Sequence, residues 1–299
     1  MDKTISPAIP ESMVVPPSES ELRRIMRVFR RRRISFVSLI FIIALIFTAI
    51  FAPWVAPYDP YEQDLRNMRG EPDSQHLLGT DNLGRDTLSR IIYGSRTSLT
   101  VGVVAIGIAA AIGMGLGVVA GYFGGVTYMI IMRSIDAMMA IPGILLALTI
   151  SALLGRGLNN VIIAIGISMI PPYARLMCAQ TMVIKDRDYI KFMKVIGASP
   201  VRIIVMHIIP NCFPPLIVLM TMMLGGAIMA EAGLSFLGIG VLPPTATWGA
   251  MISDGYNWIL TVPELSIAPG FAIMFTVFAF NMAGDGLRDA LDPRLRGSL

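Results

Sequence analysis

The sequence predicts an all-α membrane protein with six transmembrane helices. Of its 299 residues, 55% are hydrophobic and only 15% are charged, whereas a soluble domain usually carries about 25% charged residues. The apolar residues gather in runs close to the ~20 residues that a helix needs to cross the hydrocarbon core of a bilayer. Segments rich in Gly, Pro and charge separate these runs. The composition therefore favours one polytopic membrane unit over two soluble domains.

The first 33 residues are expected to lie on one side of the membrane. Met1 to Ser20 is rich in Pro and Ser, which is typical of a disordered tail. Residues 22–33 combine an apolar face with many arginines, which fits a basic amphipathic helix on the membrane surface or a simple positively charged anchor. The transmembrane domain follows as residues 34–299. Its first span is the apolar run 34–52, which is too long for a cleaved signal peptide.

Residues 53–96 form the predicted segment on the exterior side. Gly79 and Gly84 permit tight turns, and Asp86 can begin a short helix, where the helix dipole favours its carboxylate. Apolar residues would lay that helix on the membrane surface: Leu88, Ile91 and Ile92. His76 has no partner at metal-ligand spacing, so we expect a solvated histidine. For three charged residues of this segment, a role in the turns and the helix start is favoured over a catalytic role: Asp81, Arg85 and Asp86.

The second predicted span covers residues 97–120. Its last part has glycine at every fourth position: Gly113, Gly117 and, directly after the span, Gly121. This spacing places the three on one helix face, where small residues allow a neighbouring helix to approach closely. We therefore expect them to serve helix packing.

The third predicted span, about residues 130–151, is interrupted by Asp136 and by Pro142. Ionisable residues within spans are commonly functional, which makes Asp136 a candidate for lining a transport pathway. Capping, or pairing with Arg133, is the alternative. Pro142 predicts a kink. The fourth predicted span follows at about residues 161–173.

Residues 175–207 form a basic, hydrophilic segment between apolar runs, as expected of a cytoplasmic loop. Its pattern predicts a helix over residues 181–196, which Gly197 ends in the left-handed conformation. Ser199 can cap a second helix, with Pro200 in its first turn. The segment would then present a short helix below the membrane as a docking element.

The fifth predicted span covers residues 208–231 and the sixth about residues 267–282. Between them, residues 232–264 are too broken by Gly and Pro to span, so their backbone must be buried in protein or line a wet cavity. We interpret this part as a re-entrant or exterior segment near a pore mouth. Glu231 and Trp248 are its candidate pathway residues, and a place in an interface is the alternative for Glu231.

The charged residues agree with a cytoplasmic N-terminus. Every lysine and most arginines then fall on the cytoplasmic side, as the positive-inside rule requires. This clustering explains the net charge of +4 without a nucleic-acid partner. Asp285 and Asp289 share a helix face but lack a third ligand, so a solvated end is favoured over a metal site. The two cysteines show no disulfide or metal pattern.

Four segments resemble known transport proteins. Tyr189 and Gly197-Ala198-Ser199 resemble the coupling loop of ABC importer permeases, although Lys191-Phe192-Met193 replaces the Glu-Ala-Ala of that loop. The run from His76 to Leu99 resembles one permease subunit of dipeptide and oligopeptide importers. Its matching positions are Gly79, Asp81, Gly84, Arg85 and Asp86. Further matches to this subunit are Leu234-Ser235-Phe236-Leu237-Gly238, Pro243-Pro244, Trp248-Gly249 and the run 284–293.

The resemblance implies a type I ABC importer permease in a bacterial inner membrane. It implies four kinds of partner: a second, related permease, two ATP-binding subunits, an exterior substrate-binding protein and the lipid bilayer. ATP and Mg would be bound by the ATP-binding subunits, and this chain would bind no cofactor. Residues matched to ATPase coupling are Asp188, Tyr189, Lys191, Lys194, Gly197, Ala198 and Ser199. The implied cargo is di- or oligopeptides, with nickel or glutathione as alternatives.

Motifs for covalent chemistry are missing from the sequence. It contains no Gly-x4-Gly-Lys-Ser/Thr phosphate loop, no His-Glu-x-x-His and no Gly-x-Ser-x-Gly. We therefore expect a transport subunit and no enzyme. A self-contained secondary transporter is the alternative, but such proteins usually show repeated halves and charges deep within their spans.

Overall fold

The computed structural model describes residue 29 and residues 32–291. The regular secondary structure of this part is helical, apart from an isolated bridge between Thr80 and Asp86. Five helices are long and apolar enough to cross a membrane, and one bent pair can make a sixth span. The structure thereby confirms the predicted all-α membrane fold. The tail and most of the amphipathic helix predicted for residues 1–33 lie outside the described residues.

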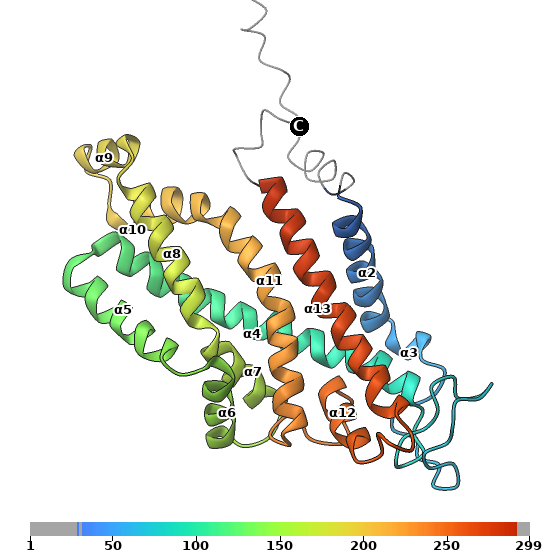
Figure 1. Ribbon diagram of the computed structural model, residues 1–299. Coiled ribbons are helices and arrows are strands. Elements are labelled where there is room, and N and C mark those ends of the chain that lie inside the picture. Colours follow the sequence, from blue (N-terminus) through green and yellow to red (C-terminus); the bar gives the residue numbers. More distant parts are fainter. Residues whose placement is uncertain (1–28, 30–31, 292–299) are drawn as a thin grey trace, which may run out of the picture.

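The helices follow one another along the chain, most with short connections, and the longest connection among them is the loop 56–86 between α3 and α4 (Figure 1). Their bounds are α2 Arg33–Ile50, α3 Ala52–Val55, α4 Thr87–Phe123, α5 Gly125–Met139, α6 Gly143–Leu154, α7 Leu158–Ser168, α8 Ile170–Lys185, α9 Asp188–Val195, α10 Pro200–Ile203, a π-helical turn Ile204–Ile208, α11 Ile209–Phe236, α12 Trp248–Tyr256 and α13 Glu264–Leu291.

Helix α4 crosses the other spans obliquely (Figure 1) and is longer than the sequence predicted. Asp86 caps it by accepting a hydrogen bond from the backbone N–H of Ser89 at 2.7 Å, as expected. The predicted short surface helix and the second span, however, form one continuous helix of 37 residues. Its first turns are held inside the protein, since Ser89 and Ile92 are buried. The prediction of a helix lying on the membrane surface was therefore wrong.

Two spans are broken near their middles. The axes of α5 and α6 differ by 91° across residues 140–142, so Pro142 marks a sharp break instead of a mild kink. The fourth span also consists of two helices, because α7 ends at Ser168 and α8 starts at Ile170 with proline in its first turn. Neither α8 nor α13 ends where the sequence predicted, since both continue beyond their apolar stretches.

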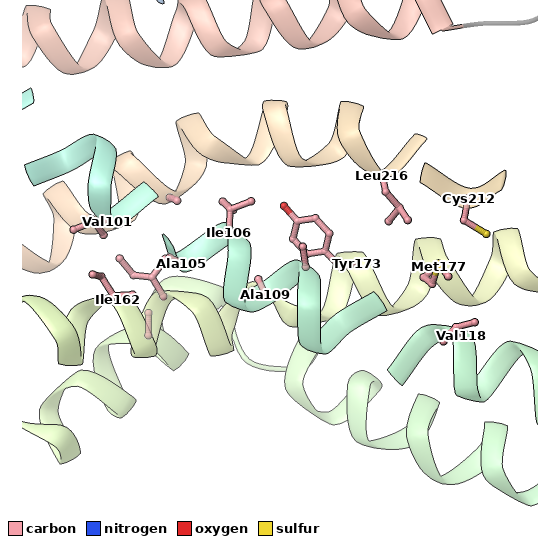
Figure 2. Close-up of a cluster of buried hydrophobic side chains, with 14 of the residues drawn as sticks. Val101, Ala105, Ile106, Ala109, Val118, Ile162, Tyr173, Met177, Cys212 and Leu216 are labelled. Carbon is pink, nitrogen blue, oxygen red and sulfur yellow. The ribbon is translucent and has the colours of Figure 1, made fainter. Parts of the chain in front are cut away.

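The largest core cluster lies where α4, α7, α8 and α11 meet. Small side chains on α4, such as Ala105 and Ala109, are fully buried. Tyr173 of α8 lies beside Ala109, and Leu216 of α11 belongs to the same cluster near Met177 of α8 (Figure 2). This packing fixes α8 against α4, and α8 carries the segment predicted to dock partners.

The two ends of the bundle differ. We call the end that carries α9 and α10 the α9 end, and the opposite end, with α12 and the loop 56–86, the α12 end (Figure 1). At the α9 end, Arg32 and Asp289 form an ion pair of 2.7 Å. Asp289 therefore has a basic partner, contrary to the expected solvated position.

Candidate functional site

The segment predicted to dock partners protrudes at the α9 end. The expected helix over residues 181–196 is in fact two helices, because the chain turns at Asp186 and Arg187 between α8 and α9. Arg187 has an extended backbone with ψ 144°, which a continuous helix excludes. The break allows α9 to leave the axis of α8 (Figure 1).

Gly197 ends α9 in the way the sequence predicted. Its φ is 81°, a conformation that costs glycine little. The N–H of Gly197 donates to the carbonyl of Lys194 at 3.1 Å, and the N–H of Ala198 to that of Met193 at 3.0 Å. These two bonds form a Schellman motif. Ser199 then caps α10 by accepting a hydrogen bond from the N–H of Arg202 at 3.3 Å. The run Gly197-Ala198-Ser199 thus links two helices through a backbone turn and one side-chain cap.

One face of α9 is anchored and the other is open. Ile190 is fully buried, and Lys194 lies 5.3 Å from the ring centroid of Tyr122 at the end of α4. Tyr189 packs against His207, with ring centroids 6.3 Å apart. Apolar side chains nevertheless stay exposed on the outer face, namely Phe192 at 63%, Val195 at 82% and Ile196 at 59%. Asp188 and Lys191 form only an exposed ion pair of 3.7 Å.

The glycines of α4 lie directly against α8. A Cβ atom at Gly113 would stand 2.7 Å from Tyr173 Cβ, and one at Gly121 would stand 2.7 Å from Thr181 Cβ. Gly117 lies between them, against Ala174 and Met177. At the end of this contact, Lys185 Nζ donates to the carbonyl of Gly121 at 2.8 Å. Since any side chain would force the two helices apart, the glycines permit the contact that positions α8.

Asp136 forms an ion pair, but its partner is not Arg133. Arg175 Nη2 donates to Asp136 Oδ1 at 2.6 Å, and the two side chains are 50% and 45% exposed. Arg175 was assigned to the start of a cytoplasmic loop, whereas it lies within α8. The pair therefore joins α5 to α8 next to the breaks in both spans. Sequence reasoning missed Arg175 as the partner of Asp136, because the two are 39 positions apart and an arginine that follows an apolar run usually lies outside the span.

Glu231 and Trp248 do not face an open space in this chain. Both are buried, Glu231 completely. The carboxylate of Glu231 accepts hydrogen bonds from Ser98 at 3.1 Å and from Ser235 at 2.8 Å, which ties α11 to α4. Trp248 Nε1 donates to the carbonyl of Ile91 at 3.0 Å. Both residues hold helices together at the α12 end, where the sequence had suggested a pathway.

The predicted turns at the α12 end enclose a buried ion cluster. Asp81 Oδ2 accepts from Arg85 Nε at 2.7 Å and lies 3.3 Å from Arg90 Nε. Asp81 Oδ1 also accepts from the N–H of Leu83 at 2.9 Å and that of Arg85 at 3.0 Å. Burial raises the pKa of the nearby Asp254 carboxyl, while Arg90 and Arg85 oppose that shift. The cluster joins the loop 56–86 to α4 and α12, and this arrangement is structural.

His76 also belongs to this end of the molecule. Its Nδ1 lies 2.9 Å from Asp86 Oδ1, and its side chain is only 17% exposed. The ring of Tyr58 packs beside it, with centroids 4.8 Å apart. The expectation of a solvated histidine was therefore wrong, because the turns at Gly79 and Gly84 bring His76 back to the start of α4.

Two family models match separate parts of the chain. Residues 113–297 match the model of the binding-protein-dependent transport system inner membrane component. Residues 20–76 match that of the N-terminal TM domain of oligopeptide transport permease C. The glutathione transport system permease protein GsiD of Escherichia coli O6:K15:H31 is 46% identical over 272 residues, which are 91% of this chain and 90% of that protein. GsiD of Shigella boydii serotype 4 matches with the same figures.

Solved structures of the MetNI methionine ABC transporter in inward-facing conformations share the fold. One superposes with a TM-score of 0.56 at 18% identity, covering 69% of this chain and 97% of that chain. A second crystal form gives a TM-score of 0.55 and covers 68% and 96%. The chain belongs to the binding-protein-dependent transport system inner membrane component family and is a multi-pass inner-membrane permease of a peptide- or oligopeptide-type bacterial ABC importer.

Proposed function

We propose that this permease forms half of the translocation pathway of a small-peptide importer, and that α9 is the helix through which ATP-binding subunits drive it. The observation that carries the proposal is the open apolar face of α9. Phe192, Val195 and Ile196 are exposed beyond the ends of the spans, and exposed apolar patches on a polar rim mark interaction sites. Lys191 and Lys194 supply that rim.

The departure from the usual coupling loop fits this reading. The family pattern has an acidic residue where this chain has Lys191, so the polar contact it would supply is missing. Phe192 next to it is exposed, while Met193 packs against the core. An apolar contact from Phe192 and Val195 would replace the acidic one. Closure of the ATP-binding subunits would then move α9 and, through the tightly packed α8, shift the spans between outward and inward access.

The orientation proposed for the chain places the α9 end in the cytoplasm. Basic residues gather there on several helices: Arg32, Lys185, Arg187, Lys191, Lys194, Arg202 and Arg288. The positive-inside rule assigns such a concentration to the cytoplasmic face. Both termini would then be cytoplasmic, and the loop 56–86 would meet an exterior substrate-binding protein.

The proposed cargo is small peptides, with glutathione included because it is itself a tripeptide. The permeases that share 46% identity with this chain bear the name of a glutathione transport system. The matched N-terminal model is that of an oligopeptide permease. Nickel is less favoured, since the described residues hold no group of three or more His, Cys, Asp or Glu side chains that could bind a metal.

Affinity purification of the chain from mild detergent, followed by mass spectrometry, tests the proposal. We expect a second, related permease and one or two ATP-binding proteins in the purified complex. A chain that purifies alone, as a stable monomer or homodimer in several detergents, would contradict the proposal and favour a self-contained transporter.

A further inference from the structure

The ion pair between Asp136 and Arg175 lies at the depth where a bilayer is driest. Arg175 precedes the end of α8 by ten residues, and Asp136 follows the start of α5 by eleven, which corresponds to ~15–17 Å along each helix axis. The hydrocarbon core of a bilayer is about 30 Å thick. In Figure 1 the end of α5 and the beginning of α8 lie between the levels of α9 and α12. The pair is therefore near the midplane.

Contact with lipid tails would be energetically unfavourable for this ion pair. Its two side chains are 50% and 45% exposed, and charged groups in spans almost always face a bundle interior or a water-filled cavity. The break between α5 and α6 begins about one turn after Asp136, and beside it Ile141 and Ile144 are 46% and 48% exposed. Non-helical backbone at membrane depth occurs only where protein covers it or water reaches it.

The pair also has unused hydrogen-bonding capacity. Within the described residues, Arg175 makes one side-chain hydrogen bond, to Asp136 Oδ1. A guanidinium carries five N–H donors in a fork that matches a carboxylate, and Asp136 keeps its second oxygen. A solute carboxylate could therefore bind Arg175 while a solute ammonium group binds Asp136, without either residue losing its neighbour.

We propose that Asp136 and Arg175 form a charge-recognition site in the wall of the aqueous pathway, where they contact the carboxylate and the ammonium group of a small zwitterionic solute. The site deepens the proposed function and rests on it, since a small peptide carries both charges. It differs from selection by a binding protein because it acts within the membrane.

Thiol labelling tests the site without knowledge of the cargo. Cells would express the complete importer, and their membranes would be opened by freeze–thaw so that reagent reaches both faces. Ala179 is exposed one turn beyond Arg175 on α8, and Ala179→Cys would report on the pathway. Ile40→Cys is the matched control, because Ile40 is 52% exposed and lies seven residues from the start of α2, about as far as Ala179 lies from the end of α8. The unaltered chain, with Cys178 and Cys212 buried, gives the background.

We expect a trimethylammonium-ethyl methanethiosulfonate to label Ala179→Cys at least about tenfold faster than Ile40→Cys, because thiols react as thiolates that water stabilises. Equal, slow labelling would place the pair against lipid or the second permease and would overturn the proposal. Loss of ATP-binding subunits from the purified complex, by contrast, would count against the proposed function alone.

Charge recognition is tested in the same assay with an anionic sulfonato-ethyl reagent. Arg175→Gln leaves Asp136 unpaired and should raise the ratio of cationic to anionic labelling about fivefold, whereas Asp136→Asn should lower it by a similar factor. Exchanging the two residues in Asp136→Arg/Arg175→Asp keeps a pair and should restore the ratio. A ratio that none of these variants changes would show that the pair does not act on solutes and would overturn the proposal.

Discussion

The two ends of the permease use the same helix ending in opposite surroundings. Gly197 ends α9 and Gly238 ends α11, with φ of 81° and 75°. Both endings have the two hydrogen bonds of a Schellman motif. In the second ending, the N–H of Gly238 donates to the carbonyl of Ser235 and the N–H of Ile239 donates to that of Leu234, at 3.0 Å each. Beside Gly197, Val195 is 82% exposed, and beside Gly238, Phe236 and Leu237 are 40% and 54% exposed. Only beyond Gly238 does the chain reach a buried residue of this size, Trp248, which is 1% exposed.

This comparison shows that the local sequence determines the backbone geometry of the turn. The rest of the fold determines which side chains beyond the turn are buried and which stay exposed. At the α12 end the turns bury charges and hold the loop 56–86 to the bundle. At the α9 end a similar turn exposes apolar side chains that no part of the described chain covers. The first end therefore contributes to stability, and in the proposed function the second end contacts a partner, so changes at the two ends should separate stability from transport.

The largest effect on stability is expected at the α12 end, from Asp81→Asn. Arg85 and Arg90 are only 4% and 3% exposed, and both would lose the negative charge of their partner. Breaking a buried pair costs about 3–5 kcal/mol, and we expect the low end because the amide oxygen still accepts a hydrogen bond. Thermal unfolding in detergent, followed by size-exclusion chromatography, would show the loss.

Asp59→Asn is the matched control for that variant. Asp59 is exposed in the same loop and accepts a hydrogen bond from the N–H of Tyr61 at 2.7 Å. Its change should stay within about 0.5 kcal/mol, as for most surface substitutions. Equal destabilisation by the two variants would contradict the structural role given to the buried cluster.

A smaller effect is expected from removing one helix cap at each end. Thr247 is fully buried and accepts from the N–H of Ala250 at 3.2 Å, so Thr247→Ala should cost about 1–2 kcal/mol. Ser199 caps the exposed α10, and Ser199→Ala should cost about 0.5 kcal/mol. The two melting curves compared side by side would check the order. A reversed order would mean that the α9 end contributes more to folding than its exposure indicates.

The largest effect on transport is expected from Gly197→Pro, whose strain should stay local to α9 and α10. Proline fixes φ near −65°, which is incompatible with the φ of 81° at this position, so α9 and α10 change their relative direction. Nothing lies within 4 Å of the Gly197 Cβ position, and the bundle should stay folded. Unchanged ATP-driven uptake in this variant would refute the coupling role of the turn.

Much of the fold could be predicted from sequence because its determinants are local. The apolar run 34–52 became α2, the carboxylate of Asp86 capped α4, and Gly197 ended α9 with Ser199 starting the next helix. Each of these depends on neighbours within a few residues. Composition, glycine and cap positions are therefore sufficient for them.

The candidate sites depended on distant partners, and there the predictions were weaker. Asp136 pairs with Arg175, which is 39 positions away in the sequence. Glu231 accepts a hydrogen bond from Ser98, which is 133 positions away. From sequence spacing, only Arg133 could be suggested as a partner for Asp136, and no partner could be suggested for Glu231. These contacts follow from how α4, α5, α8 and α11 cross, and the crossing is set by tertiary packing that one sequence does not display.

The central claim, that α9 receives the ATP-binding subunits, is tested most directly by photo-crosslinking at Val195. A benzoylphenylalanine placed there in the complete importer should capture an ATP-binding subunit on irradiation. The same probe at Leu260, which is 96% exposed at the α12 end, should capture none. Capture of lipid alone at Val195, or of the ATP-binding subunit at both positions, would contradict the claim.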